Sequence, residues 1–238
     1  GNPARSPAVE AVYRRRLREI AGDDAQLGRF AASYSDPAGD HAFRVALAEA
    51  LALRYGWPVT ERNVALASGS QTAFTALFNL FAGECSDGPR MRILLPLETI
   101  ADVGAICVSR PTNPSGNVLT LDELARLDAL ARARGVPLII DAAYGEPFPG
   151  IQFVGPGLLW NDNTVLCLSL SKLGLPATRT GIVVAHEEVI EALTAFNATA
   201  SLAPCATGAV IVEPLLRSGE IEALCAETIR PSYAARSS

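Results

Sequence analysis

Short runs of apolar residues alternate along this chain with segments whose apolar positions recur every three or four residues. The unbroken runs are typical of strands covered on both faces. They occupy residues 64–67, 92–95, 104–108, 136–140, 164–168 and 181–185. Helical spacing occurs over residues 40–55, 72–81, 121–134, 187–196 and 207–217. This alternation predicts an α/β fold in which helices flank a mostly parallel sheet.

The ends of the helix at residues 121–134 carry clear signals. Thr120 is the expected N-cap, and Glu123 stands three residues later, which is the spacing of a capping box. Gly135 is the expected C-cap. These signals make this the helix with the best-defined ends in the sequence.

The connection between the second and third expected strands is short. Residues 96–103 alone separate them, whereas a parallel crossover needs about a dozen residues or more, usually with a helix. Either the two strands are antiparallel partners in a hairpin, or a segment is missing between them.

Composition favours a soluble enzyme. The chain has 238 residues, enough to bury the core of one domain or somewhat more. Although 49% of the residues are hydrophobic, no apolar run reaches about 18 residues, so we expect no transmembrane helix. Residues 1–22 lack the apolar centre of a signal peptide, so we expect none. The net charge of −5 argues against a nucleic-acid partner. The cluster Arg14–Arg16 is expected to be a solvated helix face.

The cysteines and histidines exclude other classes of site. Two of the five cysteines lie in apolar runs and are expected to be small core residues. The five are scattered without a CxxC pair, which favours a reducing, cytoplasmic location over a disulfide scaffold. His41 and His186 have no metal-ligand spacing with each other or with the cysteines. We therefore expect no metal site.

The most informative segment surrounds Lys172. It follows the run 164–168 and opens a loop rich in glycine and proline, with Ser169 before it and Arg179 after it. A lysine at such a position can lose its proton and attack a carbonyl to form a Schiff base. Hydroxyls and a guanidinium suit a phosphate, so the segment suggests pyridoxal 5′-phosphate (PLP). The alternative is an exposed loop lysine.

Two further segments bear on that cofactor. Asp141 follows the run 136–140, at the end of a parallel strand where open α/β sheets bind ligands. A carboxylate there would keep the PLP pyridine nitrogen protonated, although an aspartate is also common in turns and caps. Residues 109–117 contain the turn dipeptides Asn113-Pro114 and Ser115-Gly116.

Taken together, these segments resemble a family. Asn-Pro-x-Gly at 113–116, Asp-x-x-Tyr at 141–144 and Ser-x-Ser-Lys at 169–172, with Arg179 downstream, resemble the fold-type I PLP-dependent aminotransferases. The longer strings narrow the resemblance to the valine–pyruvate (alanine–valine) transaminases. These strings are residues 1–4, 69–83, 107–118, 141–150 and 169–176. The resemblance runs over most of residues 34–233.

The resemblance implies a role for each matching residue. Lys172 would form the Schiff base and shuttle a proton, and Asp141 would pair with the pyridinium nitrogen. Tyr144 and Asn113 would hydrogen-bond the phenolic oxygen of PLP, and Asn113 also belongs to the implied substrate site. Gly1 would leave room for the substrate carboxylate.

The phosphate site implied by the resemblance uses Ser70, Gln71, Ser169 and Arg179. Tyr34 would reach the phosphate of a neighbouring subunit, which implies a homodimer. Three purely structural alternatives stay open: Tyr34 as a core tyrosine, Ser70 as a plain N-cap, and Arg179 in a structural ion pair.

The resemblance also implies a domain plan. A three-layer PLP-binding large domain would occupy residues 34–218, after an arm at 1–33. Residues 219–238 would begin a helix leading to a small domain that is largely absent from this chain. Relatives carry several dozen more residues near 96–103, including an aromatic residue that stacks on PLP, and their small domain supplies an arginine for the substrate carboxylate.

Three functions follow as hypotheses. The first is an aminotransferase that moves an amino group between a small aliphatic amino acid, such as alanine or valine, and a 2-oxo acid such as pyruvate. The second is another PLP enzyme on the same fold, namely a lyase, a decarboxylase or a racemase. The third is a non-catalytic remnant, which the missing aromatic and arginine would favour.

Overall fold

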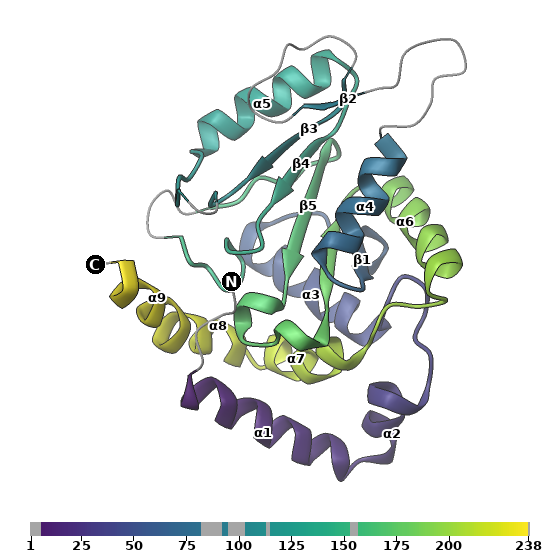
Figure 1. The fold of residues 1–238 in the computed structure, drawn as a ribbon, viewed down its shortest axis with the longest axis vertical. Helices are drawn as coiled ribbons and strands as arrows, with labels where there is room; N and C mark the ends of the chain where they lie inside the picture. Colours follow the sequence, from purple (N-terminus) through teal and green to yellow (C-terminus); the bar gives the residue numbers. More distant parts are fainter. Residues whose placement is uncertain (1–5, 82–91, 95–102, 113–114, 153–156, 238) are drawn as a thin grey trace.

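The computed structural model describes residues 6–81, 92–94, 103–112, 115–152 and 157–237 (Figure 1). Two expected site residues, Gly1 and Asn113, lie outside these ranges. Within them, no helix has both the length and the apolar character that crossing a membrane requires.

A six-stranded sheet in the order β1-β6-β5-β4-β3-β2 forms the centre of the molecule. Its strands are β1 (Val64–Ala67), β2 (Arg92–Leu94), β3 (Val103–Ser109), β4 (Leu138–Asp141), β5 (Thr164–Ser169) and β6 (Gly181–Val184). Strands β2 to β5 run parallel, whereas β6 is antiparallel to both β5 and β1. The mostly parallel sheet is confirmed. The hairpin alternative is wrong, because β2 pairs with β3 in the parallel direction.

The helices surround this sheet. They are α1 (Pro7–Ala21), α2 (Asp24–Leu27), α3 (His41–Tyr55), α4 (Ser70–Phe81), α5 (Leu121–Ala133), α6 (Glu187–Ala200), α7 (Thr207–Arg217), α8 (Glu220–Leu224) and α9 (Arg230–Ser237). Shorter helical turns are η1 (Gly28–Ala32), η2 (Glu61–Asn63), η3 (Ser171–Leu173), η4 (Pro176–Thr178) and η5 (Cys225–Ile229).

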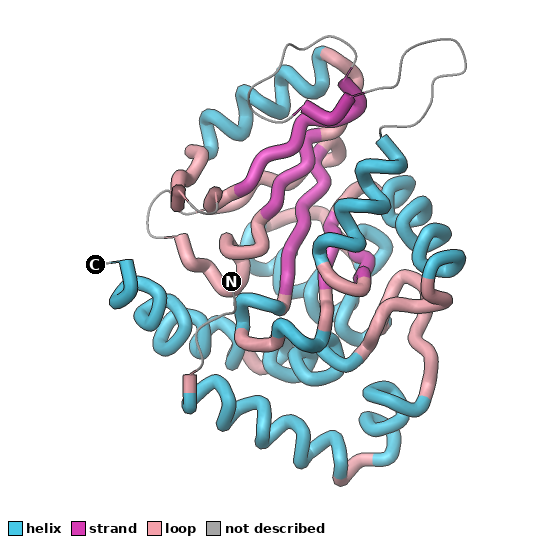
Figure 2. The backbone as a smooth tube through the Cα atoms, in the orientation of Figure 1, coloured by secondary structure: helices cyan, strands magenta, loops and turns pink. Residues whose placement is uncertain are grey.

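Successive strand residues enter two different cores, one on each face of the sheet. Figure 2 shows the strands with helices around them. Ile139, Val165 and Cys167 face α4 and α6, together with Leu77 and Leu193. Their neighbours in the same strands, such as Leu138 and Leu166, join the core formed with α3, α5 and α7. Because both faces are covered, the strands need apolar residues at every position, as the unbroken runs predicted.

The capping box expected at the start of α5 is confirmed. The Thr120 N–H donates to Oε2 of Glu123 at 2.7 Å, and the Glu123 N–H donates to Oγ1 of Thr120 at 3.2 Å. The helix ends at Ala133 and its C-cap is Arg134, so the expected C-cap at Gly135 is wrong by one residue. Gly135 comes next, with φ +65°, a conformation that glycine adopts at little cost. Helix α4 begins at Ser70, two residues before the expected start.

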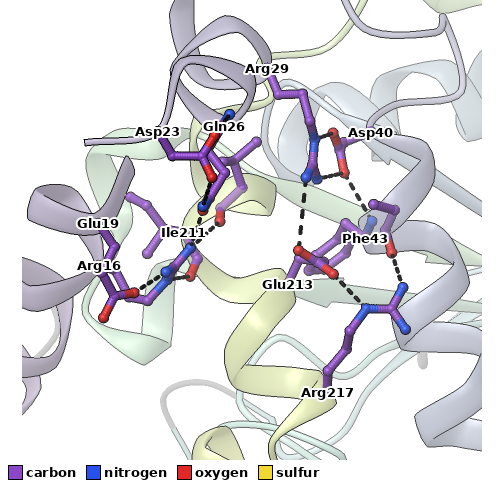
Figure 3. Close-up of polar contacts among 12 residues, drawn as sticks. Arg16, Glu19, Asp23, Gln26, Arg29, Asp40, Phe43, Ile211, Glu213 and Arg217 are labelled. Atoms are coloured by element: carbon purple, nitrogen blue, oxygen red, sulfur yellow. Dashed lines mark hydrogen bonds and ion pairs between the residues drawn. The ribbon is translucent and has the colours of Figure 1, made fainter. Parts of the chain in front are cut away.

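The expected solvated face at Arg14–Arg16 is wrong for one residue. Arg14 and Arg15 are exposed, but Arg16 is buried and reaches from α1 to α7, where its Nε donates to the Ile211 carbonyl at 3.3 Å. Its guanidinium also contacts Glu19 and Gln26 (Figure 3). Arg16 therefore links α1 to α7 from a buried position.

Candidate active site

Lys172 lies on η3, immediately after β5, and its side chain is half-buried. Its Nζ stands 4.6 Å from the centroid of the Tyr144 ring, which belongs to the loop after β4. This is a cation–π distance. The exposed-loop alternative is therefore wrong, and the Ser-x-Ser-Lys and Asp-x-x-Tyr segments meet in space.

Asp141 is the last residue of β4, beside Ser109 of β3 and Cys167 of β5 in the register. Its Oδ1 accepts a hydrogen bond from the Ala143 N–H at 3.0 Å. This is the turn interaction that the sequence left open as an alternative for this aspartate. Burial raises the pKa of this carboxyl above its ordinary value. Burial, followed by the Asp141 charge, likewise raises the pKa of the Cys107 thiol, to about 12. The Cys107 thiol therefore stays uncharged, and it does not compete with Asp141 for a cationic partner.

A cradle for an anion forms where α4 begins. Gly69 has φ +98°, and its carbonyl accepts hydrogen bonds from the N–H groups of Thr72 and Ala73 at 3.1 and 3.2 Å. The N–H groups of Ser70 and Gln71, at the very start of α4, have no backbone partner among the described residues and are left for a ligand. A Cβ on Gly69 would overlap the Arg179 guanidinium, and a Cβ on Gly181 would lie 2.6 Å from the Ser70 nitrogen. Because both residues are glycines, the start of α4 can approach the start of β6 and the Arg179 guanidinium closely.

Arg179 and Ser70 complete the cradle. Arg179 is exposed, has φ +46°, and its Nη2 donates to Oε1 of Gln71 at 3.5 Å. Among the described residues no carboxylate pairs with it, which disfavours the structural ion pair. Ser70 is the first residue of α4, and its hydroxyl donates to the Leu168 carbonyl at 3.4 Å, so it is not a plain N-cap.

Ser169 connects the cradle to the lysine. It is buried at the end of β5 and lies opposite Gly181 in the register. Its Oγ accepts a hydrogen bond from the Ser171 N–H at 3.1 Å. This bond orients the turn on which Lys172 stands, a contribution that the sequence did not reveal.

Tyr34 lies apart from this group. Its side chain is 82% exposed, so the core-tyrosine alternative is wrong. It lines a cavity of about 510 Å³ together with Ser68 and the segment Pro204–Ala206. A tyrosine that faces solvent beside the residues leading into α4 is placed to contact another molecule.

A larger cavity of about 1030 Å³ opens beside Asp141 and Gln71. Its apolar wall includes Phe74 and Phe78 of α4 and Cys107 of β3. Sequence reasoning missed these as site residues. The phenylalanines four residues apart mark one helix face, but such a face is indistinguishable from core without the fold.

The donor set fits PLP. The half-buried amine of Lys172 can react with a carbonyl, and Asp141 supplies a carboxylate at the carboxyl end of a strand. The cradle at Gly69, Ser70, Gln71 and Arg179 offers amides and a guanidinium to a phosphate. These groups belong to elements whose ends meet at one edge of the sheet, where the arrowheads of β4 and β5 point (Figure 1).

Filling the cradle tests this fit. Gly69→Ala is expected to weaken PLP binding by about tenfold or more, because the new methyl displaces the Arg179 guanidinium. Gly56→Ala is the matched control, since Gly56 also has positive φ but has open space around it. Both variants should lose about 1–2 kcal/mol of unfolding free energy. Titration with PLP and chemical denaturation separate the two effects; equal PLP affinities in both variants would contradict the cradle.

Comparisons with known proteins agree with this geometry. A family model described as aminotransferase class I and II matches residues 95–237. Valine–pyruvate aminotransferase of Escherichia coli K12 is 38% identical over 274 residues, covering 98% of this chain and 66% of the relative. The aligned stretch is longer than the chain itself, so the relative carries residues with no counterpart here.

Two solved structures extend the similarity to the fold. A putative amino-acid aminotransferase from Psychrobacter arcticum 273-4 has a TM-score of 0.94 and 37% identity, covering 100% of this chain and 68% of that one. Valine–pyruvate aminotransferase from Salmonella typhimurium LT2 has a TM-score of 0.90 and 37% identity, covering 99% and 69%. The chain thus spans about two thirds of the length of these relatives. On the family match, the chain belongs to the class I and II aminotransferases, which depend on PLP.

Proposed function

We propose that this protein catalyses PLP-dependent transfer of an amino group between a small aliphatic amino acid, of the alanine or valine type, and a 2-oxo acid such as pyruvate. The observation that carries the proposal is the contact of Lys172 with Tyr144 at the sheet edge where Asp141 ends β4. The substrate class is supported by the similarity to valine–pyruvate aminotransferases.

Each residue then has a chemical task. PLP, when bound, acts as an electron sink for the substrate. Lys172 holds the cofactor and moves the proton at the substrate Cα. Asp141 keeps the pyridine nitrogen protonated, and its burial makes a cationic partner favourable because charge pairing lowers the cost of ionising a dry carboxyl. Tyr144 orients the lysine and donates to the phenolic oxygen, and Asn113 is proposed to share that task.

The phosphate is assigned to the cradle. The first-turn amides of Ser70 and Gln71 and the Arg179 guanidinium supply donors, and Ser169 supplies a hydroxyl at the adjoining end of β5. The helix dipole of α4 favours a dianion at this position. Gly1 is proposed to leave space for the substrate carboxylate.

The experiment that tests the reaction is a half-reaction. Holoenzyme mixed with L-alanine in the absence of an oxo acid is expected to lose its visible cofactor band, gain the pyridoxamine phosphate band and release one pyruvate per active site. Carbon dioxide release, loss of stereochemistry at Cα, or ammonia release would instead identify a decarboxylase, a racemase or a lyase. No spectral change with L-alanine or L-valine would contradict the proposal.

We further propose a cytoplasmic homodimer, with residues 34–218 as the cofactor-binding unit. The location is supported by the free thiols of Cys107, Cys167, Cys205 and Cys225. The dimer is supported by the exposure of Tyr34, which suits a residue that completes the site of a neighbouring subunit.

Mixed subunits test that arrangement. A Lys172→Ala subunit lacks the amine but still presents Tyr34, whereas a Tyr34→Phe subunit keeps the amine. With PLP held near the Kd of the parent protein, hybrids are expected to be more active than either variant homodimer, because one site of each hybrid is then intact and binds PLP with the parent's affinity. Light scattering measures the dimer. If Tyr34 serves its own subunit, no hybrid site is intact and mixing restores no activity.

A further inference from the structure

The Tyr34 loop, which we define as residues 33–39, is closed at its base by an ion pair. Arg29 lies on η1, before the loop, and Asp40 is the N-cap of α3, after it. Arg29 Nη2 lies 2.7 Å from Asp40 Oδ1, and Arg29 Nε lies 3.1 Å from Asp40 Oδ2 (Figure 3). The two parallel hydrogen bonds fix the direction of the pair as well as its distance.

Charges of alternating sign continue behind this pair. Glu213 of α7 approaches Arg29 at 3.9 Å and binds Arg217 at 2.5 Å, and Arg217 reaches Glu49 of α3 at 3.0 Å. Asp40 is buried and also accepts a hydrogen bond from the Phe43 N–H at 2.9 Å. Hydrogen bonding to Asp40 raises the pKa of Arg29. The aspartate is therefore held from the α3 side, and Arg29 joins it to η1 at the other end of the loop. Thr207 of α7 also holds η1, through its hydrogen bond to the Phe30 carbonyl at 3.4 Å.

Within the loop, the second half is fixed independently of Arg29. The Ala38 N–H donates to Oδ1 of Asp36 at 2.7 Å, and Asn197 donates to the Pro37 carbonyl at 2.9 Å. The first half has fewer ties, of which one is the bond from the Ser35 hydroxyl to the Pro204 carbonyl at 3.2 Å. Tyr34 itself makes no hydrogen bond to the described residues, so its position follows from the loop.

We propose that the Arg29–Asp40 pair is the clasp that sets the position of Tyr34, which makes Arg29 a positioning residue for the phosphate site of the neighbouring subunit. The proposal rests on the function proposed above for Tyr34. It adds a residue that touches neither PLP nor substrate and acts through the geometry of one loop.

A double-mutant cycle on PLP affinity tests the clasp in the 238-residue chain. Arg29→Ala and Tyr34→Phe are each expected to weaken PLP binding by about tenfold, and the double variant no further, because both remove the same phosphate contact. Arg217→Ala is the matched control. It cuts the ion pairs with Glu213 and Glu49 and the hydrogen bond to the Ala42 carbonyl, but it leaves both hydrogen bonds of the clasp, so its PLP affinity should equal that of the parent.

Hydrogen exchange supplies a second readout and separates the two proposals. Arg29→Ala should speed amide exchange in the Tyr34 loop, and Arg217→Ala should not. Additive effects on PLP affinity, or unchanged exchange in Arg29→Ala, would overturn the clasp. An unchanged affinity in Tyr34→Phe would instead overturn the phosphate role of Tyr34, and the exchange rates would then decide the clasp alone. If Arg29→Ala does not fold, Asp40→Asn keeps the N-cap acceptor, weakens the ion pair and carries the same expectations.

Discussion

Replacing Lys172 with alanine is expected to abolish turnover and the visible absorbance of bound PLP. Lys172 is the only lysine in the chain, so no other side-chain amine can take its place. Its half-buried position against Tyr144 places this amine beside the loop after β4, at the end of the sheet where Asp141 lies. Borohydride reduction of the holoenzyme, followed by peptide mapping, should place the label on the peptide that contains Lys172.

Lys172→Arg is the matched control, because it keeps a cation beside Tyr144 but cannot form a Schiff base. Arginine should preserve the fold and still eliminate the absorbance and the activity. Label on the amino terminus, or an active Lys172→Arg variant, would contradict the assignment.

Asp141→Asn is expected to lower the rate of the half-reaction by about a thousandfold while leaving part of the PLP binding intact. The neutral amide cannot hold the pyridine nitrogen protonated, whereas the cradle at α4 still binds the phosphate. Stopped-flow absorbance with L-alanine measures the rate. Asp162→Asn, which changes an exposed carboxylate at the opposite end of β5, is the control. A rate within about tenfold of the parent would exclude this role.

Asp141→Asn is expected to lower the rate, but it should not lower the stability of the apoprotein at neutral pH. Burial raises the pKa of Asp141 above its unfolded value of about 3.9, so the folded state binds this proton more tightly. The contribution of Asp141 to stability is thus greatest at acid pH and is lost as the pH rises through the folded pKa. At neutral pH, Asp141→Asn should be at least as stable as the parent by denaturant titration, which separates a catalytic loss from unfolding.

The sheet and much of the site were predictable from the sequence for a physical reason. Strands covered on both faces require unbroken apolar runs, and the residues that end those runs, such as Asp141 and Ser169, must lie at the sheet edge. The contact between Lys172 and Tyr144 agrees with the motif order.

Other features depend on contacts between distant segments, which periodicity does not encode. The sequence pattern allowed β2 to pair in either direction with β3, and only the fold shows that it is parallel. Arg16 was expected at the surface because charged clusters usually are, yet α7 offers it a carbonyl in the core. Cys107 was expected to be a core residue, and it is buried, but the cavity beside Asp141 reaches it.

The antiparallel strand β6 determines when the cofactor site can form during synthesis. It pairs Val64 with Val184 and brings Gly181 against Ser70, so both halves of the phosphate cradle come from segments more than a hundred residues apart. A nascent chain that has emerged only as far as β5 contains the start of α4 but not its counterpart. PLP can therefore stabilise the protein only after β6 has emerged from the ribosome. Folding before that point must rely on the apolar layers alone.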